Sequence, residues 1–331
     1  MGYRVAILGA TGAVGTELLN LIEERQFPAD SIKLLASSRS AGRKISFHGD
    51  NLTVKEANEE AFKDIDIVLS SASKAVSEKL APAAVDSGAV VIDNTSRYRM
   101  DEKVPLVIPE VNEYAIAQNS GIIANPNCST IIMALPLYPL HKAFGVKRVH
   151  VATYQAASGA GMQAMRELEE ETRAQLDGKS YDRTVIPHQY AFNLFIHNSN
   201  LLDNWYVEEE MKMLNETRKI FGDSELQVNA VCVRVPILRA HSEALNIQFK
   251  NDVSPDDAYE VLRSSPGIEV LEDPETNRWP MPVDASGKDS VYVGRIRRDI
   301  SQPNTLDLWV VGDQIRKGAA LNAIQIAENL S

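Results

Sequence analysis

The sequence predicts an α/β protein that consists of two domains. In residues 1–127, short apolar runs alternate with amphipathic stretches, which is typical of a mostly parallel sheet wrapped by helices. After Cys128 the apolar runs are longer and alternate with polar residues, which indicates an α+β domain with a mostly antiparallel sheet. The length of 331 residues also exceeds that of one average domain.

Strands and helices are expected to alternate along the first domain. The strand candidates are Val5–Leu8, Ile32–Ala36, Ile67–Ser70, Val90–Ile92 and Ile122–Ala124. Helix patterns lie at Val14–Glu24, Val76–Ser87 and, near the C-terminus, Ile315–Asn329. We expect the last helix to pack back on the first domain. The predicted boundaries are therefore 1–127 with 313–331 for the first domain and 128–312 for the second.

The second domain is expected to contain longer strands, with helices that cover one face of its sheet. The strand candidates are Arg148–Tyr154, Leu226–Val235, Glu243–Phe249, Val291–Ile296 and Thr305–Val311. The helix candidates are Ser129–Phe144 and two acidic stretches, near Met162–Leu176 and Val207–Ile220.

Composition and charge exclude several classes of partner. The net charge of −11 repels nucleic acids and anionic membranes, and no basic stripe offsets it. No run reaches the roughly eighteen apolar residues that span a bilayer, and the N-terminus has no signal-peptide layout. The two cysteines, Cys128 and Cys232, are too few for a disulfide scaffold and fit a reducing compartment. We therefore expect a cytoplasmic protein with a small-molecule substrate and no metal site.

A glycine-rich turn follows the first predicted strand and opens the first helix. Its glycines, Gly9, Gly12 and Gly15, allow a tight turn, and a pyrophosphate can then sit on the helix N-terminus. An ordinary strand–helix turn is the alternative for an isolated glycine pattern. The position directly after the first strand favours a Rossmann-type domain. The expected dinucleotide contacts are Gly9, Thr11, Gly12, Ala13 and Val14.

The residues after the second predicted strand distinguish NADP from NAD. An NAD-binding domain carries an acid there, because a carboxylate accepts a hydrogen bond from the ribose 2′-hydroxyl. In this chain hydroxyl groups and a guanidinium follow the strand instead, and they suit a 2′-phosphate. The sequence therefore predicts NADP(H) as the cofactor, bound by Ser37, Arg39 and Ser40. A solvated loop arginine is the alternative interpretation of Arg39.

Cys128 is a candidate nucleophile. It lies at the start of a predicted helix, directly after Asn125-Pro126-Asn127. The positive end of the helix dipole and the free N–H groups of the first turn stabilise a thiolate at that position. Cys232 lies in the middle of a predicted strand, where a small buried hydrophobic residue is the simpler interpretation.

These motifs, with others in the same order, resemble the aspartate-semialdehyde dehydrogenase family over nearly the whole chain. The matching segments are Gly9–Gly15, Ser37–Gly42, Asn94–Arg99, Val107–Asn112, Pro126–Thr130, Tyr154–Gly161, Glu209–Lys212, Arg234–His241 and Gly312–Ala320. The resemblance implies reduction of aspartyl β-phosphate to aspartate β-semialdehyde with NADPH, on the branch to lysine, threonine and methionine. In the reverse, oxidative direction inorganic phosphate is the co-substrate.

The resemblance implies three catalytic residues. Cys128 resembles the nucleophile, which gives a thiohemiacetal with the semialdehyde and then a thioester once hydride has left to NADP. His241 resembles the acid/base partner, and Gln155 resembles the residue that orients the reacting group. Asn127, next to the cysteine, is implied to contact the substrate. Without the resemblance, a structural histidine and an ordinary polar strand end are the simpler interpretations.

Further substrate ligands are implied in the same way. Arg234 resembles the arginine that binds the α-carboxylate, Glu209 the ligand of the amino group, and Lys212 a phosphate ligand. Without the resemblance, Glu209 and Lys212 would be interpreted as an exposed i,i+3 ion pair. Arg99 resembles the second phosphate ligand, and Arg97 is the nearby alternative.

The remaining implied cofactor contacts are Ser71, Ala72, Ser158, Gly159 and Gln314, the last of which departs from the asparagine of many relatives. Arg234 and His241 are seven residues apart, or about 23 Å along an extended strand. Both can serve one small substrate only if the chain turns back between them. The sequence therefore predicts a turn or loop after Arg234.

Two enzyme families and one non-enzymatic class are the alternatives. N-acetyl-γ-glutamyl-phosphate reductase acts on a blocked amine, which has less use for Glu209, and carries glycine where this chain has Asn127. Glyceraldehyde-3-phosphate dehydrogenase has its cysteine in Ser-Cys-Thr-Thr-Asn, which is absent here. An NADP-sensing protein needs the glycine turn but not Cys128, Gln155 or His241. The family resemblance further implies a homodimer formed through the second domain, with a tetramer as the alternative.

Overall fold

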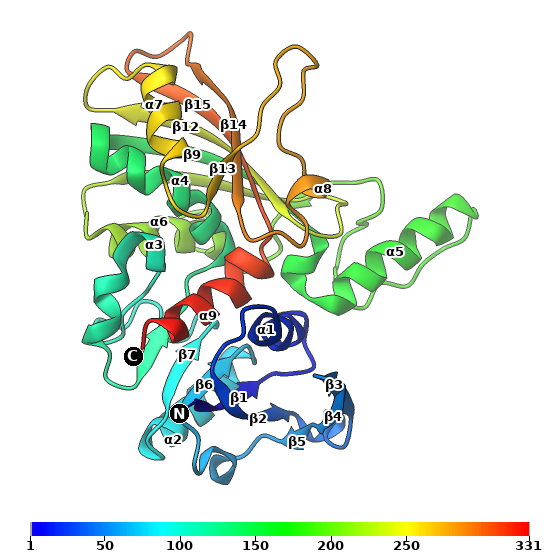
Figure 1. Ribbon diagram of the computed structural model, residues 1–331. Coiled ribbons are helices and arrows are strands. Elements are labelled where there is room, and N and C mark those ends of the chain that lie inside the picture. Colours follow the sequence, from blue (N-terminus) through cyan, green and yellow to red (C-terminus); the bar gives the residue numbers. More distant parts are fainter. Residues whose placement is uncertain (1, 331) are drawn as a thin grey trace. The chain divides into compact units, whose positions relative to one another are not determined.

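The computed structural model describes residues 2–330, which form two units (Figure 1). The first unit contains the described residues up to Asn127 and those from Ala319 onward, and the second unit is Cys128–Gly318. Among the helices of residues 2–330, none combines the length and the apolar character that crossing a membrane requires.

The chain returns to the first unit at Ala319, later than the boundary at residue 313 expected from the sequence. The buried carboxylate of Asp313 accepts hydrogen bonds from the N–H groups of Ile315, Arg316 and Gly287. Because Gly287 belongs to the second unit, these bonds hold the start of the returning segment there.

The first unit is built around a six-stranded sheet in which all neighbouring strands are parallel (Figure 1). The strand order is β5-β2-β1-β6-β7-β8, which is that of a doubly wound dinucleotide-binding domain. The strands are β1 Tyr3–Leu8, β2 Ala29–Ala36, β5 Lys55–Glu56, β6 Ile67–Ser70, β7 Val90–Asp93 and β8 Ile122–Ala124. A separate antiparallel pair consists of β3 Lys44–Phe47 and β4 Asp50–Thr53. The predicted parallel fold is confirmed.

Helices of the first unit bury their apolar sides on this sheet. They are α1 Ala13–Glu24, α2 Lys74–Asp86, α3 Pro109–Asn112 and α9 Leu321–Glu328. Helices α1 and α9 contact each other, and Leu18, Leu21 and Ile324 lie in one apolar core with the strands. The C-terminal helix therefore packs on the first unit as predicted, although a π-helical turn, Arg316–Ala320, precedes it.

The second unit contains a seven-stranded mixed sheet with the order β10-β11-β9-β12-β15-β14-β13. Only the pairs β11–β9 and β14–β13 are parallel, so the sheet is mostly antiparallel as predicted. The strands are β9 Val146–Gln155, β10 Phe195–Ile196, β11 Gln227–Arg234, β12 His241–Phe249, β13 Ile268–Val270, β14 Val291–Arg298 and β15 Thr305–Gly312. The sequence analysis missed β10 and β13, because strands this short contain too few residues to show an alternating pattern.

Three helices cover one face of the second sheet: α4 Cys128–Phe144, α6 Glu208–Phe221 and α7 Pro255–Arg263 (Figure 1). Helix α4 lies over the central strands, with α6 over β11 and α7 over β13 and β14. Side chains that alternate along β9, β12 and β15 point at these helices and are buried, whereas those between them are partly exposed. Two further helices, α5 Met162–Leu176 and α8 Pro282–Ala285, follow β9 and precede β14 in the chain.

Two carboxylates of α5 hold the loop that follows this helix. Glu167 accepts the backbone N–H groups of Thr184, Val185 and Ile186, and Glu171 accepts those of Tyr190 and Ala191. The acidic residues of this helix therefore fix the course of a segment with no strand or helix of its own. A carboxylate that accepts several backbone N–H groups is well compensated for its burial.

Glu243, on β12, is a carboxyl group whose burial is not compensated by hydrogen bonds within residues 2–330. Its side chain is fully buried, and within residues 2–330 neither of its oxygens has a hydrogen-bond partner. Burial raises the pKa of Glu243 well above its ordinary value, because an ion there would lose its hydration. A carboxyl group with a raised folded-state pKa costs stability as the pH rises from its unfolded pKa through its folded pKa.

We therefore expect Glu243→Gln to stabilise the protein, and to do so more at pH 9 than at pH 5. The amide keeps the shape of the protonated carboxyl group and cannot ionise. Each unit of pKa difference is worth about 1.4 kcal/mol of unfolding free energy above the folded pKa. Thermal unfolding at the two pH values measures the effect, with the exposed Glu275→Gln as control. An equal melting-temperature shift at both pH values would contradict a protonated Glu243.

Candidate active site

Each of the three positions in the first turn favours glycine for a different physical reason. Gly9 has φ +90°, and a Cβ there would meet the backbone of Ser71 at 2.8 Å. A Cβ on Gly15 would meet the Gly9 carbonyl oxygen at 2.2 Å, so this glycine lets α1 pack closely on the turn. A Cβ on Gly12 would meet only the Gly9 oxygen, at 3.4 Å, so Gly12 is exposed and open to a ligand. This is the cradle that a pyrophosphate requires.

The residues predicted to contact the cofactor in the first unit meet at the carboxyl ends of β1, β2 and β6. Strand β1 lies between the other two, which makes this edge the topological switch point of the sheet. Ser71 and Ala72 follow β6 and lie against Gly9. Thr11 Oγ1 lies 3.5 Å from Ser40 Oγ, which joins the glycine turn to the residues after β2. Ala13 and Val14 are the first residues of α1.

Arg39 lies in a short 3₁₀ turn, Ser38–Ser40, directly after β2. Its side chain is exposed, as is Ser37, and within residues 2–330 it forms no ion pair. The guanidinium is therefore available to a ligand at the edge of the sheet where the dinucleotide is expected. No carboxylate occupies the end of β2.

We expect Arg39→Ala to raise the KM for NADP by about ten- to hundredfold, because one hydrogen bond to a charged group is lost. The KM for NAD is expected to change little, since NAD has no 2′-phosphate. Steady-state kinetics with both cofactors measures the two values. Equal weakening of both would mean that Arg39 supports the turn and that the 2′-phosphate is bound elsewhere.

Cys128 is the first residue of α4, at the positive end of a long helix. Its side chain is partly exposed, and Gly318 lies against it: a Cβ on Gly318 would meet Cys128 Cβ at 2.9 Å. The next residue, Ser129, accepts a hydrogen bond of 2.9 Å at Oγ from Gln155 Nε2. Gln155, the last residue of β9, is therefore beside the cysteine.

His241 is fully buried at the start of β12. Its Nδ1 accepts a hydrogen bond of 3.0 Å from the N–H of Ala156, the residue after Gln155. A neutral ring that accepts at Nδ1 carries its proton on Nε2, and within residues 2–330 Nε2 has no partner. Burial, and after it the charge of Arg234, lower the pKa of His241 to about 3. His241 is therefore a neutral imidazole with a free N–H.

The backbone before His241 is unusual and is held by Gln314. Ala240 has φ +74°, in the left-handed region that residues other than glycine rarely adopt. Its N–H donates to Gln314 Oε1 at 3.0 Å, and Gln314 Nε2 donates to Ser158 Oγ. The buried Gln314 side chain thus positions the turn that presents His241 and the loop that contains Ser158. It was predicted to contact the cofactor, and in the structure both ends of its amide are engaged inside the second unit.

The predicted turn between Arg234 and His241 is confirmed: β11 ends at Arg234 and β12 begins at His241. Both side chains meet at Gly159. A Cβ on this glycine would lie 2.8 Å from Arg234 Nη1 and 3.0 Å from His241 Nε2. Any side chain at position 159 would displace both groups, so this position requires glycine.

Glu209 and Lys212 lie in the first turns of α6 and form an ion pair of 3.0 Å. The interpretation as an exposed pair does not hold, because the Glu209 side chain is only 6% exposed. The charge of Glu209 acts on both His197 and His241 and raises their pKa values, against the larger effect of burial. The pair therefore belongs to the same polar cluster as Arg234.

Two predicted substrate ligands, Asn127 and Arg99, belong to the first unit and are buried. The Arg99 guanidinium donates to the backbone oxygens of Asn125 and Asn94, at 2.9 and 2.7 Å. The alternative, Arg97, is paired with Glu78 at 2.9 Å. Arg99 is therefore fixed by backbone oxygens, whereas Arg97 is engaged with a carboxylate.

Cys232 is buried in β11, where burial raises the pKa of its thiol. It lies beside Met213, with the sulfurs 3.8 Å apart. A thiol held in this way is an inert core residue. Within residues 2–330 no group of three histidine, cysteine or acidic residues is placed to hold a metal ion.

His197 is a residue of this cluster that the sequence analysis missed. Its ring atom Nε2 lies 2.8 Å from Arg234 Nη2. It stands alone in a loop without a recognisable motif, so only the pairing of β10 with β11 could have placed it beside Arg234.

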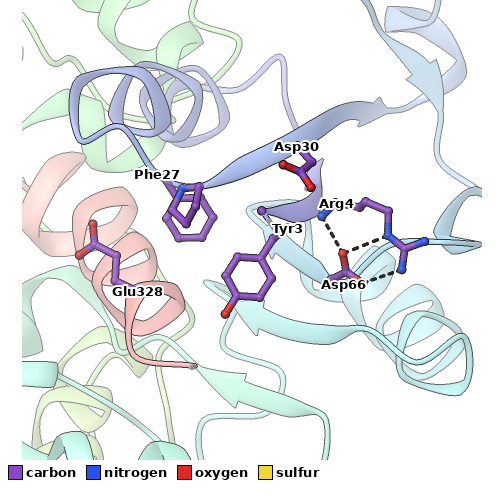
Figure 2. A pocket seen from close by; sticks show the side chains of 8 residues that line it. Tyr3, Arg4, Phe27, Asp30, Asp66 and Glu328 are labelled. Atoms are coloured by element: carbon purple, nitrogen blue, oxygen red, sulfur yellow. Dashed lines mark hydrogen bonds and ion pairs between the residues drawn. The ribbon is translucent and has the colours of Figure 1, made fainter.

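A cavity of about 770 Å³ lies at the amino ends of β1, β2 and β6, where Tyr3, Phe27 and Asp66 line it (Figure 2). Its charged side chains are three acids and one arginine, and Arg4 donates to Asp66 through both Nε and Nη2. These bonds lower the pKa of Asp66 to about 2. Arg4 pairs with Asp66, Glu328 pairs with Arg25, and the cavity contains no candidate nucleophile, so we do not assign the active site to it.

Comparison with known proteins gives consistent relatives over the whole chain. Residues 4–119 match the family model of the semialdehyde dehydrogenase NAD-binding domain, and residues 137–317 match that of the semialdehyde dehydrogenase dimerisation domain. An aspartate-semialdehyde dehydrogenase from Synechocystis is 54% identical, over 99% of this chain and 97% of the relative.

Two solved structures are also similar. A Vibrio cholerae aspartate semialdehyde dehydrogenase II complexed with ASA has a TM-score of 0.97 and 45% identity, covering 100% of this chain and 98% of that one. A Candida albicans aspartate semialdehyde dehydrogenase with NADP has a TM-score of 0.74 and 27% identity, with the same coverage.

Proposed function

This chain belongs to the aspartate-semialdehyde dehydrogenase family, and we propose that it reduces aspartyl β-phosphate to aspartate β-semialdehyde and phosphate through a thioester on Cys128. It is an NADP-dependent oxidoreductase of amino-acid biosynthesis. The observation that best supports the mechanism is that Gln155 bonds Ser129, the residue after Cys128, while the N–H of the next residue, Ala156, bonds His241.

Cys128 attacks the acyl carbon, and inorganic phosphate leaves with the electron pair of the broken C–O bond. The thioester then accepts hydride, which is the chemistry that bound NADPH supplies. The resulting thiohemiacetal oxyanion needs a hydrogen-bond donor, and His241 Nε2–H is a free one. Collapse of the intermediate returns the electron pair to sulfur and releases the aldehyde. In the oxidative direction phosphate cleaves the thioester.

The dinucleotide fits the first unit, because the open backbone at Gly12 leaves room for a pyrophosphate on the N-terminus of α1. Ser37, Arg39 and Ser40 would hold the 2′-phosphate. The remaining proposed contacts are Gly9, Thr11, Ala13, Val14, Ser71, Ala72, Ser158, Gly159 and Gln314.

The substrate has a carboxylate, an amino group and a phosphate, and each needs a partner of opposite charge. Arg234 is proposed for the α-carboxylate, because its Nε–H has no partner within residues 2–330 and its cluster is buried. Glu209 is proposed for the amino group. Lys212 and Arg99 are proposed for phosphate, and Asn127 for a contact beside the cysteine. These cations supply local positive charge that the net charge of −11 does not.

An assay of the purified protein tests the proposed function. NADP reduction with phosphate is compared between aspartate semialdehyde and N-acetylglutamate semialdehyde. We expect turnover of the first and little of the second, because Glu209 has no charged amino group to bind in an acylated substrate. Preference for the acylated substrate would assign the chain to N-acetyl-γ-glutamyl-phosphate reductase chemistry.

The second unit is also proposed to form a homodimer. Exposed apolar side chains gather on the segment next to β10 and β11, with Phe192 64%, Leu201 60% and Trp205 85% exposed. A patch of this kind on one edge of a sheet is typical of a protein interface. Sedimentation of the purified protein distinguishes the dimer from a tetramer. Within residues 2–330, Cys128 and Cys232 form no disulfide, which supports the proposed cytoplasmic location.

A further inference from the structure

His197 connects Arg234 to the start of α6. The residue follows β10 and is 9% exposed. Its backbone N–H donates to the carbonyl of Cys232 at 2.8 Å, which fixes the backbone independently of the side chain. Its ring then lies between Arg234 and Ser199.

Both ring nitrogens of His197 have hydrogen-bond partners. Arg234 Nη2 can only donate, so His197 Nε2 must accept, at 2.8 Å. On the other side of the ring, Nδ1 lies 3.1 Å from Ser199 Oγ and accepts a hydrogen bond of 3.2 Å from the backbone N–H of Ser199. Ser199 Oγ also accepts a hydrogen bond of 3.1 Å from the N–H of Glu209. A chain of hydrogen bonds thus runs from Arg234 through His197 and Ser199 to the first turn of α6.

Burial and the charges around His197 keep its ring in the neutral form that the hydrogen bond from Arg234 requires. The pKa of His197 is lowered to about 4: burial is the largest cause, Glu209 acts in the opposite direction, and Arg234 and Lys212 also lower the pKa. These are the charged groups that face it from β11 and α6. At neutral pH the ring can therefore accept from a guanidinium without carrying a proton of its own on Nε2.

Two acceptors orient the Arg234 guanidinium: His197 Nε2 and the Ala156 carbonyl oxygen, at 3.1 Å from Nη1. The N–H at Nε has no partner within residues 2–330 and is buried. These two acceptors thus bond the Nη groups of Arg234, and the N–H at Nε remains for another acceptor. Without His197 the Nη2 group would be free to turn, and the grip on a carboxylate would lose its geometry.

We propose that His197 is a positioning residue: it holds the Arg234 guanidinium in the orientation that binds the substrate carboxylate and couples it to the helix that carries Glu209. This inference rests on the proposed role of Arg234. His197 does not touch the reacting atoms, so its removal affects substrate affinity and leaves the chemical step in place.

Three variants test the inference: His197→Leu, His197→Gln and Arg234→Lys. In His197→Leu the acceptor is lost, and the KM for aspartate semialdehyde is expected to rise about ten- to hundredfold with kcat and the KM for NADP nearly unchanged. In His197→Gln the amide oxygen accepts from Arg234 and the amide N–H₂ donates to Ser199, so the KM is expected to return to within about fivefold of the native value. With propanal, which has no carboxylate, all His197 variants are expected to match the native enzyme.

The outcomes separate this inference from the proposed function. An unchanged KM in Arg234→Lys, whose ammonium cannot copy a two-pronged grip, would overturn the role of Arg234 itself. A raised KM in Arg234→Lys together with an unchanged KM in His197→Leu would overturn the inference alone. Equal losses in His197→Leu and His197→Gln, with lowered melting temperatures and weaker propanal turnover, would show that His197 only supports the fold.

Discussion

Cys128→Ala is expected to reduce turnover by more than about a thousandfold while NADP affinity stays nearly constant. The side chain sits at the first position of α4, where the helix dipole favours an anion, and no other described thiol can replace it. The predicted cofactor contacts at the glycine turn are on separate elements, so binding of NADP does not need the thiol. Single-turnover kinetics and a direct binding titration measure the two quantities.

Cys232→Ala is the matched control. This thiol is buried in β11, burial raises its pKa, and its sulfur lies against Met213. We expect its removal to leave turnover intact and to cost some stability through the cavity that forms. Residual activity of Cys128→Ala above about a thousandth of the native rate would contradict covalent catalysis.

His241→Asn is expected to lower kcat by about a hundred- to ten-thousandfold. The asparagine side-chain oxygen can still accept from the Ala156 N–H, so the backbone contact is retained. The N–H that His241 presents at Nε2 is lost, and the oxyanion of the thiohemiacetal then has no donor at that position. Steady-state kinetics at several pH values measures the change, with the exposed His188→Asn as control.

The pH dependence of this effect differs from what an unperturbed histidine would give. From the sequence alone, His241 is expected to titrate near neutral pH and to shape the rate between pH 6 and 8. In the structure its pKa is lowered to about 3, first by burial and then by Arg234. The imidazole ring of His241 is therefore neutral throughout the interval from pH 6 to 8. The loss in His241→Asn is expected to be constant from pH 6 to 8, and a loss that varies tenfold over this interval would contradict a permanently neutral ring.

The sequence alone was sufficient for the fold class, and it predicted the helix that begins at the candidate nucleophile, Cys128. Apolar runs such as Ile67–Ser70 can only be buried on both faces, which requires a parallel sheet wrapped by helices. The glycine spacing from Gly9 to Gly15 and the cysteine at a helix start are local features, because their geometry depends on a few neighbouring residues. The turn after Arg234 was also predictable, since two groups on one straight strand cannot serve one small substrate.

Only the tertiary structure decided how the site residues are held. The proton of His241 is placed by Ala156, and the ring of His197 is held by Arg234; the two residues of each pair are far apart in the sequence. The buried state of Glu243 depends on helices that pack over β12, so its raised pKa has no signal in the local sequence. Short-range patterns determine strands, helices and turns. Protonation, tautomers and buried partners depend on long-range contacts, which exist only once the chain has folded.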